Sequence, residues 1–302
     1  MQLTFHHRTV LGPEAIDLIA PKAGGVYLDV TLGGGGHTAL LLEASGPSGR
    51  VFGLDRDPDA LAAASARLAE YGERFQPVRG TFADLTRLMD GQRVDGLVAD
   101  LGVSSPQLDR GERGFSLMRP GPVDMRMDGD APLSAAELIA QSTEDELMAI
   151  IRNYGEERHS RRVARALLAG QPFADTAQMA AVVAAAVPGK PGRIHKATRT
   201  FQALRIAVND ELGQLTSLLD QLPALLAVGG RAAVIAYHSL EDRQVKHRFR
   251  AMAGEGAQKD AYGNPMVAPM ARLLNRRAIT ESSDNPRARS ARMRGLELLK
   301  QQ

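Results

Sequence analysis

The chain has 302 residues, 44% of them hydrophobic, which is enough for one large or two ordinary domains with a real core. It contains no cysteine, so disulfide bonds and thiolate metal sites are excluded, and its start lacks the apolar core of a signal peptide. No apolar run approaches the roughly 20 residues of a membrane span, and we therefore expect a soluble cytoplasmic protein.

The formal net charge of +2 hides an uneven distribution. Counting Lys and Arg against Asp and Glu gives −4 for residues 1–100, 0 for residues 101–240 and +6 for residues 241–302. A basic C-terminal part suits phosphate contacts with a polyanion, although a basic tail is also an ordinary solubility device.

A glycine-rich turn follows the first predicted strand. The apolar run at 26–30 leads into four glycines at 33–36, and the composition of 38–43 favours a helix. Glycine has no Cβ and tolerates positive φ angles, which lets a ligand lie against the backbone beside the N–H groups of the following helix. The turn is therefore a candidate binding loop; the alternative is a turn that merely connects two elements.

The spacing within this turn bears on the ligand. The dinucleotide fingerprint G-x-G-x-x-G fits poorly, because it places Thr38 where its third glycine should stand, and NAD is not expected. Asp29 and the glycines instead follow D-x-G-x-G-x-G, the first loop of S-adenosylmethionine-dependent methyltransferases, with Thr31 in place of the first glycine. In that interpretation the methionine carboxylate of the cofactor is the anion at the helix N-terminus.

A second strand is predicted at 50–55, followed by a helix at 59–68 with Asp57 as its N-cap and Pro58 as its first residue. The strand ends in Asp55, 26 residues after Asp29, where doubly wound folds bind ribose hydroxyls. We predict Asp55 as the ribose ligand; the alternative is a second cap or a solvated turn acid.

Two further strands are predicted at 75–78 and 94–100. Phe82 follows the third strand and is a candidate to pack on the adenine, although a lone Phe is more often part of the core. The fourth strand ends in an acid, Asp100. Strands that alternate with helices and end in acids predict a parallel sheet with its ligand crevice at the carboxyl edge.

Between residues 101 and 127 the sequence is rich in Gly, Pro, Ser and Arg and shows neither helical nor strand periodicity. A loop this long in a compact protein is usually functional or disordered. Helices follow, opened by a capping box at Thr143. We expect a first methyltransferase part at 1–107, an inserted helical substrate-recognition domain at 108–200 and a second methyltransferase part at 201–302. The helices of the insert are predicted at about 143–153, 156–169 and 177–187.

The sheet pattern resumes after the insert, with helices predicted at 198–209 and 211–222. The fifth strand is predicted at 231–237, after Gly229 and Gly230, and His238 stands at its end before another helix. The segment 254–275 is expected to be a loose loop. A closing antiparallel hairpin is predicted from residues 277–280 and 291–299.

Ten blocks of sequence follow one another along the chain: His7-Arg-Thr-Val-Leu11, Gly35-Gly-His37, Leu54-Asp-Arg-Asp-Pro58, Asp100-Leu-Gly-Val-Ser-Ser-Pro-Gln107, Arg113-Gly-Phe-Ser-Leu-Met118, Asp124-Met-Arg-Met-Asp128, Tyr154-Gly-Glu-Glu-Arg158, Ala197-Thr-Arg-Thr-Phe-Gln202, His238-Ser-Leu-Glu-Asp-Arg243 and Asn285-Pro-Arg-Ala-Arg289. With these blocks in order, the chain resembles from end to end the bacterial ribosomal RNA small-subunit methyltransferase H family, also called MraW. The family often has a charged or larger residue where Gly34 stands, so that position matters least.

The resemblance implies a class I, Rossmann-like α/β fold with a mostly parallel sheet and the inserted small helical domain. It implies N4 methylation of a decoding-centre cytidine of 16S rRNA in the small ribosomal subunit, with S-adenosylmethionine as cofactor. The sequence leaves a homodimer open. Carried onto matching positions, the resemblance assigns cofactor binding to Gly35, Gly36, His37, Asp55, Phe82, Asp100 and Gln107.

The amine of cytosine has a delocalised lone pair, so positioning is most of the catalysis. Asp100, at the end of the fourth strand, is the candidate catalytic residue: it either orients the amine or only holds the cofactor. For His238 we prefer helix capping with substrate contact to general-base catalysis.

Basic residues of the insert are better explained as RNA-backbone contacts than as metal ligands, because no cluster has metal spacing. They are His195, Lys196, Arg158, Arg161, Arg162 and Arg165, with Arg287 and Arg289 in the tail. Two other functions stay open at this point: an RNA-binding ribosome-assembly factor with a structural cofactor, and a DNA amino-methyltransferase, which the missing Pro-Pro-aromatic motif disfavours.

Overall fold

The computed structural model describes residues 9–190, 192, 194–257, 268–281 and 288–301, and the chain divides into two compact units. Unit 1 comprises the residues up to Gly102 and those from Gly213 onward, and unit 2 runs from Val103 to Leu212. The units are described separately. Among the described residues, every helix is too short or too polar to cross a bilayer.

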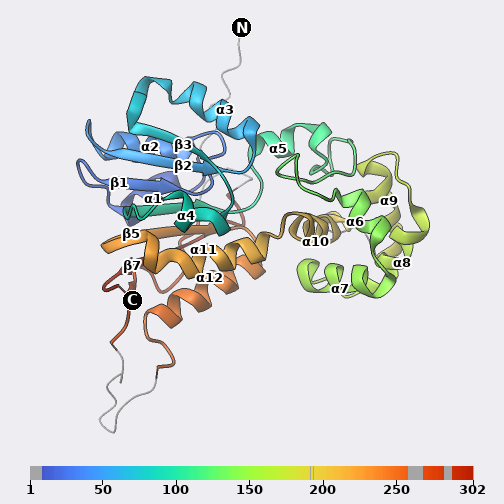
Figure 1. The fold of residues 1–302 in the computed structure, drawn as a ribbon. Helices are drawn as coiled ribbons and strands as arrows, with labels where there is room; N and C mark the ends of the chain where they lie inside the picture. The colour runs from blue at the N-terminus through green and yellow to red at the C-terminus, as the bar shows by residue number, and fades with distance from the viewer. Residues whose placement is uncertain (1–8, 191, 193, 258–267, 282–287, 302) are drawn as a thin grey trace. The chain divides into compact units, whose positions relative to one another are not determined.

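Unit 1 is built on one seven-stranded sheet with the order β3-β2-β1-β4-β5-β7-β6 (Figure 1). The first five strands of this order run parallel, and β7 runs antiparallel to both β5 and β6. This mostly parallel α/β sheet confirms the predicted fold class. The strands are β1 (Val26–Asp29), β2 (Arg50–Asp55), β3 (Phe75–Arg79), β4 (Val94–Asp100), β5 (Leu226–Ala236), β6 (Ala271–Leu273) and β7 (Arg292–Leu298).

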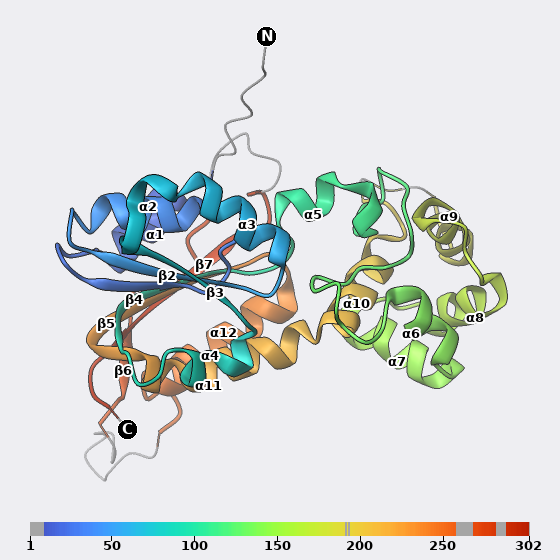
Figure 2. The same ribbon diagram turned by 45° about the horizontal axis from the view of Figure 1, so that its top comes forward.

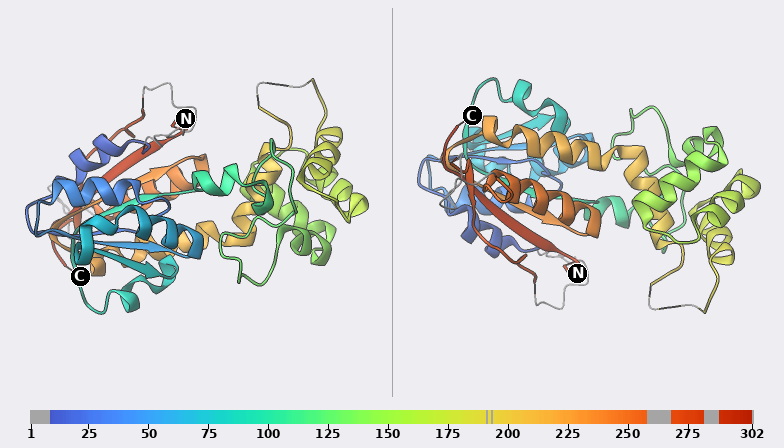
Figure 3. Two further views of the ribbon diagram at one scale, coloured as in Figure 1. Left: turned by 90° about the horizontal axis from the view of Figure 1, so that it is seen from above. Right: turned by 90° about the horizontal axis from the view of Figure 1, so that it is seen from below.

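Helices cover both faces of this sheet, as Figures 2 and 3 show from several sides. Successive residues of a strand point to opposite faces of the sheet, so Tyr27 and Leu28 of β1 enter two different core clusters. On one face lie α1 (Gly12–Ile19), α2 (Gly36–Ala44) and α3 (Pro58–Arg67), and on the other α4 (Leu85–Leu88), α11 (Glu211–Leu225) and α12 (Ser239–Met252).

Local signals in the sequence set several of these boundaries. The Asp57 side chain accepts a hydrogen bond of 3.0 Å from Asp59 N, and Pro58 is the first residue of α3, as predicted. The predicted limits of β2 and β4 are confirmed, because each is an apolar run closed by an acid.

Strand β5 begins at Leu226, five residues before the predicted start at Arg231. Its pairing with β4 is irregular, since Val94 lies opposite Leu226 whereas Gly96 lies opposite Arg231. Gly229, with φ of 79°, lies within this irregularity and allows the chain to turn inside the strand. The glycine pair therefore marks a bulge, not the end of a loop.

The predicted closing hairpin is partly wrong. Strand β7 forms as expected, but its partner is β6, which falls within the predicted loose loop. The segment 277–280 contributes an isolated bridge between Ile279 and Met293. Ala271 is buried in the core and pairs with Leu298 of β7, whereas Arg276 and Arg277 are exposed, which explains why the earlier segment pairs.

Unit 2 is helical and has a core of its own. The Thr143 capping box is present, with Thr143 Oγ1 accepting from Glu146 N. The unit extends past the predicted insert, 108–200, because the helix Thr198–Asn209 packs Phe201 and Leu204 into its core. Its helices are α5 (Ser105–Asp109), α6 (Ala135–Gln141), α7 (Glu144–Gly155), α8 (Ser160–Gly170), α9 (Thr176–Ala186) and α10 (Thr198–Asn209).

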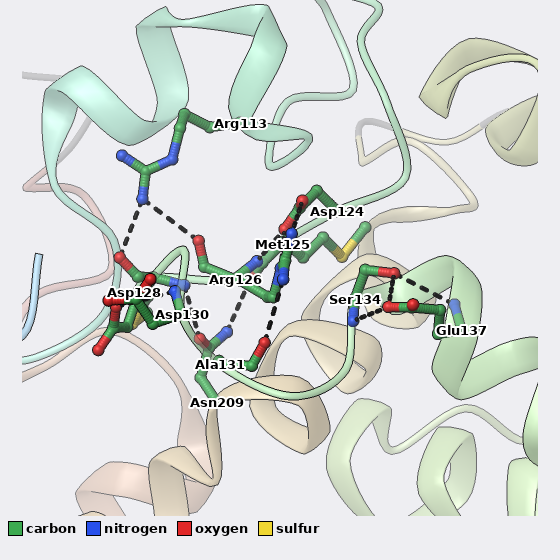
Figure 4. A network of polar contacts seen from close by, with 11 residues as sticks. Arg113, Asp124, Met125, Arg126, Asp128, Asp130, Ala131, Ser134, Glu137 and Asn209 are labelled. Carbon is green, nitrogen blue, oxygen red and sulfur yellow. Dashed lines mark hydrogen bonds and ion pairs between the residues drawn. The ribbon is translucent and has the colours of Figure 1, made fainter.

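The Gly- and Arg-rich segment of unit 2 is fixed by polar contacts (Figure 4). The Arg113 guanidinium donates to the carbonyl oxygens of Arg126 and Met127, at 3.2 and 2.9 Å. Arg126 forms a two-pronged ion pair with Asp124, at 2.9 and 2.8 Å. The buried Asn209 amide donates to Met125 O at 2.7 Å. Side chains thus replace the backbone ladder that this segment lacks.

Candidate functional site

Three carboxylates end neighbouring strands of the unit 1 sheet: Asp29 on β1, Asp55 on β2 and Asp100 on β4. Because these strands are parallel, the three residues share the carboxyl edge, where open α/β sheets bind ligands. Each carboxylate has different partners, and the differences separate a supporting role from a role in binding.

Asp29 is fully buried and supports the glycine loop. One of its oxygens accepts from Thr31 N at 3.1 Å, and the other accepts from Thr38 Oγ1 at 2.8 Å. These bonds tie the end of β1 to the loop and to the first turn of α2. Asp29 therefore shapes the edge without facing it.

The glycines of the loop differ in what surrounds them. A Cβ on Gly35, which has φ of 75° and caps α2, would lie 2.9 Å from Leu68 Cδ1. A Cβ on Gly36 would collide with Thr9 Oγ1, whereas a Cβ on Gly34 would meet nothing within 4 Å. The structure thus requires glycine at 35 and 36 but not at 34, and it brings the N-terminus of α2 to the carboxyl edge.

Both oxygens of Asp55 accept backbone hydrogen bonds, from Gly33 N and from Asp57 N, each at 2.9 Å. Burial raises the pKa of Asp55, although these two bonds oppose the shift. The partly buried carboxylate is therefore fixed against the glycine loop. Its remaining lone pairs are suited to accept from a pair of hydroxyls.

Phe82 and Gln107 lie in different units. Phe82 follows β3 in a short 3-10 turn and packs, partly buried, against the core of unit 1. Gln107 belongs to unit 2, where its buried Oε1 accepts from Ser104 N at 2.9 Å. The structure therefore brings Phe82 to the same unit as the loop residues, and a shared site that includes Gln107 stays a prediction.

Asp100 is held by three neighbours. Its backbone N donates to Thr31 Oγ1 at 2.6 Å, and its Oδ1 accepts from the Tyr237 hydroxyl at 2.7 Å. Its Oδ2 lies 3.8 Å from Nδ1 of His37, whose other ring nitrogen contacts Val10 O at 3.1 Å. The backbone and one oxygen are thus fixed, and a quarter of the side chain is exposed.

Burial raises the pKa of Asp100 to about 6, against the opposing effects of His37 and the Tyr237 hydrogen bond. Burial also raises the pKa of Tyr237, with the Asp100 charge adding to the shift, so the phenol keeps its proton and acts as a donor. At neutral pH Asp100 is mainly ionised, and its Oδ2 can accept a hydrogen bond from the N–H group of a ligand.

His238 is the N-cap of α12, which confirms the capping interpretation. Its Nδ1 accepts from Glu241 N at 3.4 Å, and its Nε2 lies 3.3 Å from Glu241 Oε1. Glu241 also accepts from Tyr237 N at 2.9 Å. Substrate contact by His238 stays a prediction.

Tyr237 was not among the residues predicted from the sequence, and Thr31 had no predicted role. Thr31 was noted as a departure from the glycine pattern, and this was a usable signal: its hydroxyl accepts from Asp100 N and so links the ends of β1 and β4. Tyr237 gave a weaker signal, a polar aromatic at the end of an apolar strand.

Several of the basic residues predicted to contact RNA form ion pairs or hydrogen bonds within unit 2. Arg161 forms ion pairs with Glu144 and Asp145, at 3.1 and 3.0 Å, and Arg165 pairs with Glu144 at 2.9 Å. Lys196 donates to the carbonyl oxygens of Val187 and Gly189. These contacts occupy the three side chains within unit 2. Of the tail arginines, Arg287 lies outside the described residues and Arg289 is exposed.

The chain is 51% identical, over an alignment of 316 positions, to the ribosomal RNA small subunit methyltransferase H of Anaeromyxobacter dehalogenans, covering 99% of this chain and all of that one. It is 53% identical over 308 residues to the protein of that name from Myxococcus xanthus, covering 98% of each chain. The family model of the MraW methylases matches residues 4–299. The chain therefore belongs to the MraW methylase family.

Proposed function

We propose that the chain transfers a methyl group from S-adenosylmethionine to N4 of a decoding-centre cytidine of 16S rRNA. Membership of the methylase family and the names of relatives about half identical over the full chain support this activity. The observation that carries it is the Asp100 carboxylate at the end of β4, with one oxygen held by Tyr237.

The carboxyl edge has the chemistry that the cofactor needs. Gly35, Gly36 and the N-terminus of α2 would receive the methionine carboxylate, because N–H groups and the helix dipole favour an anion there. Asp55 would accept from the ribose hydroxyls, and Phe82 would pack on the adenine. We assign His37, Asp100 and Gln107 to the same cofactor site by the family resemblance.

Bound S-adenosylmethionine supplies an electrophilic methyl group and leaves as S-adenosylhomocysteine. The chain's own task is to present the N4 lone pair in line with that methyl. Asp100 Oδ2 accepts one N–H of the amine and so turns the nitrogen. Its charge also favours the positive charge that develops on N4, and the amine proton held by Oδ2 then passes to this carboxylate and on to water.

Unit 2 is proposed to recognise the substrate, with the small ribosomal subunit as partner. The target base must leave its stack to reach a carboxyl edge, as in other enzymes that modify a base. We infer a cytoplasmic location from this substrate. Self-association into a homodimer also stays a prediction, which sedimentation of the purified protein would test.

Incubation with S-adenosylmethionine and either purified small subunits or naked 16S RNA, followed by mass-spectrometric mapping, tests the function. We expect one methyl on N4 of a decoding-centre cytidine. Binding without turnover would favour an assembly factor with a structural cofactor. Methylated DNA in a parallel assay would favour a DNA amino-methyltransferase. Either result would overturn the proposal.

A further inference from the structure

A small open recess of unit 1 lies between α12 and the β6–β7 pair, and its lining is basic. Phe249 and Leu273 give it an apolar side. Four cations line it: Lys246, Arg250, Arg276 and Arg294. Four positive charges around one recess repel one another unless acidic side chains neutralise them. The ion pairs of each cation therefore decide which charges remain for a ligand.

Two of these cations are compensated. Arg294 is largely buried and makes a two-pronged ion pair with Asp242, at 2.7 and 3.1 Å. Arg250 pairs with Glu255 at 3.2 Å. Within the described ranges, neither Lys246 nor Arg276 has an acidic partner, so these two charges remain for a ligand.

Both of these cations are carried by fixed backbone. Lys246 lies in the middle of α12. Arg276 follows Asn275, whose amide donates to the carbonyl oxygens of Arg277 and Met293 and accepts from Gly295 N. The bonds to Met293 and Gly295 attach the turn to β7, so the backbone that carries Arg276 is already in place beside Lys246.

We propose that this recess binds a phosphodiester of the RNA substrate through Lys246 and Arg276. The proposal rests on the proposed function, which supplies the RNA. Lys246 is eight residues after His238, about 12 Å along the helix from the carboxyl edge, at a rise of 1.5 Å per residue. A strand whose target base lies at that edge can therefore place a neighbouring phosphate over the recess.

The test is the salt dependence of binding to naked 16S RNA and to small subunits. In Lys246→Ala/Arg276→Ala, two phosphate contacts are lost, and the slope of log affinity against log salt should fall by about 1.4–1.8. Between 50 and 200 mM salt the wild-type protein should therefore lose about tenfold more affinity than the variant.

Lys22→Ala/Arg50→Ala is a matched control, because it also removes one lysine and one arginine charge from unit 1. Lys22 and Arg50 are exposed at the amino ends of β1 and β2, and neither has an ion pair within the part of the chain that the structure describes. The control should keep the wild-type slope. Both double variants should keep the wild-type affinity for S-adenosylmethionine, which shows that unit 1 is folded.

A wild-type slope in Lys246→Ala/Arg276→Ala would overturn the inference. So would a slope that changes on small subunits but not on naked RNA, because the recess would then meet an acidic protein. Failure of the proposed function is a separate observation: the wild-type protein would leave small subunits unmethylated, whatever the slopes are.

Discussion

The hydroxyl of Tyr237 donates a hydrogen bond of 2.7 Å to Oδ1 of Asp100, which ties the residue that ends β4 to the residue that follows β5. The other oxygen of the carboxylate, Oδ2, lies on the side of His37. It stabilises the ionised form of Asp100 and so opposes the effect of burial on the pKa.

Tyr237→Phe should move the acid limb of the pH–rate profile upward. A hydrogen bond worth about 1 kcal/mol corresponds to about 0.7 pKa unit, so the Asp100 pKa should rise by roughly that amount. Single-turnover rates on small subunits should fall about twofold near pH 6.5 and recover near pH 8.5. A profile that overlays that of the wild type would show that the bond does not tune the carboxylate.

Asp100→Asn should lower the methyl-transfer rate more than cofactor affinity. The amide keeps the shape and an acceptor but loses the charge that supports the developing positive nitrogen. We expect a loss of about 10²-fold or more in single-turnover rate at saturating S-adenosylmethionine. Full recovery of the rate at saturating cofactor would instead confine Asp100 to cofactor binding.

The pKa of Asp100 also predicts how stability depends on pH. The folded pKa of about 6 lies above the ordinary value of 3.8, so the folded protein binds the proton more tightly than the unfolded chain. The contribution of this group is therefore complete below pH 4 and is lost as pH rises through 6.

Asp100→Asn removes this dependence. Its free energy of unfolding relative to the wild type should rise by about 1–3 kcal/mol between pH 4.5 and 7.5. Urea denaturation at both pH values measures the difference, and Asp90→Asn, at an exposed acid, is the control. A difference that stays constant with pH would contradict the raised pKa.

The glycine loop offers a matched pair of substitutions. Gly36→Ala places a Cβ against Thr9, so that Thr9 or the loop must shift, whereas the Cβ of Gly34→Ala points into open space. We expect Gly36→Ala to weaken S-adenosylmethionine binding about tenfold or more, since the loop can no longer approach its ligand closely. Gly34→Ala should bind like the wild type. Isothermal calorimetry compares the two, and equal affinities would separate the loop from the cofactor.

The sequence predicted those features that depend on neighbours along the chain. Apolar runs closed by Asp55 and Asp100 defined two strands, and Asp57-Pro58 and Thr143 marked helix starts. Strand β6 has three residues, too few to show a period, and it forms because β7 pairs with it.

At the candidate site, too, the sequence predicted only what neighbouring residues along the chain determine. Acids at strand ends could be read from the pattern, because parallel strands bring their carboxyl ends together. The bond between Tyr237 and Asp100 could not, because it depends on the pairing of β4 with β5, which are far apart in the sequence. The ion pairs that occupy Arg161 likewise depend on how α7 packs against α8.

The position of unit 2 in the chain also bears on how the protein folds. Strands β4 and β5 are neighbours in the sheet, yet the whole of unit 2 lies between them in the sequence. The entropy cost of closing a loop falls by about 0.6 kcal/mol for each halving of its length. Early condensation of unit 2 around its own core would shorten the segment that this pairing must close. A folded insert therefore lowers the entropy cost of pairing β4 with β5.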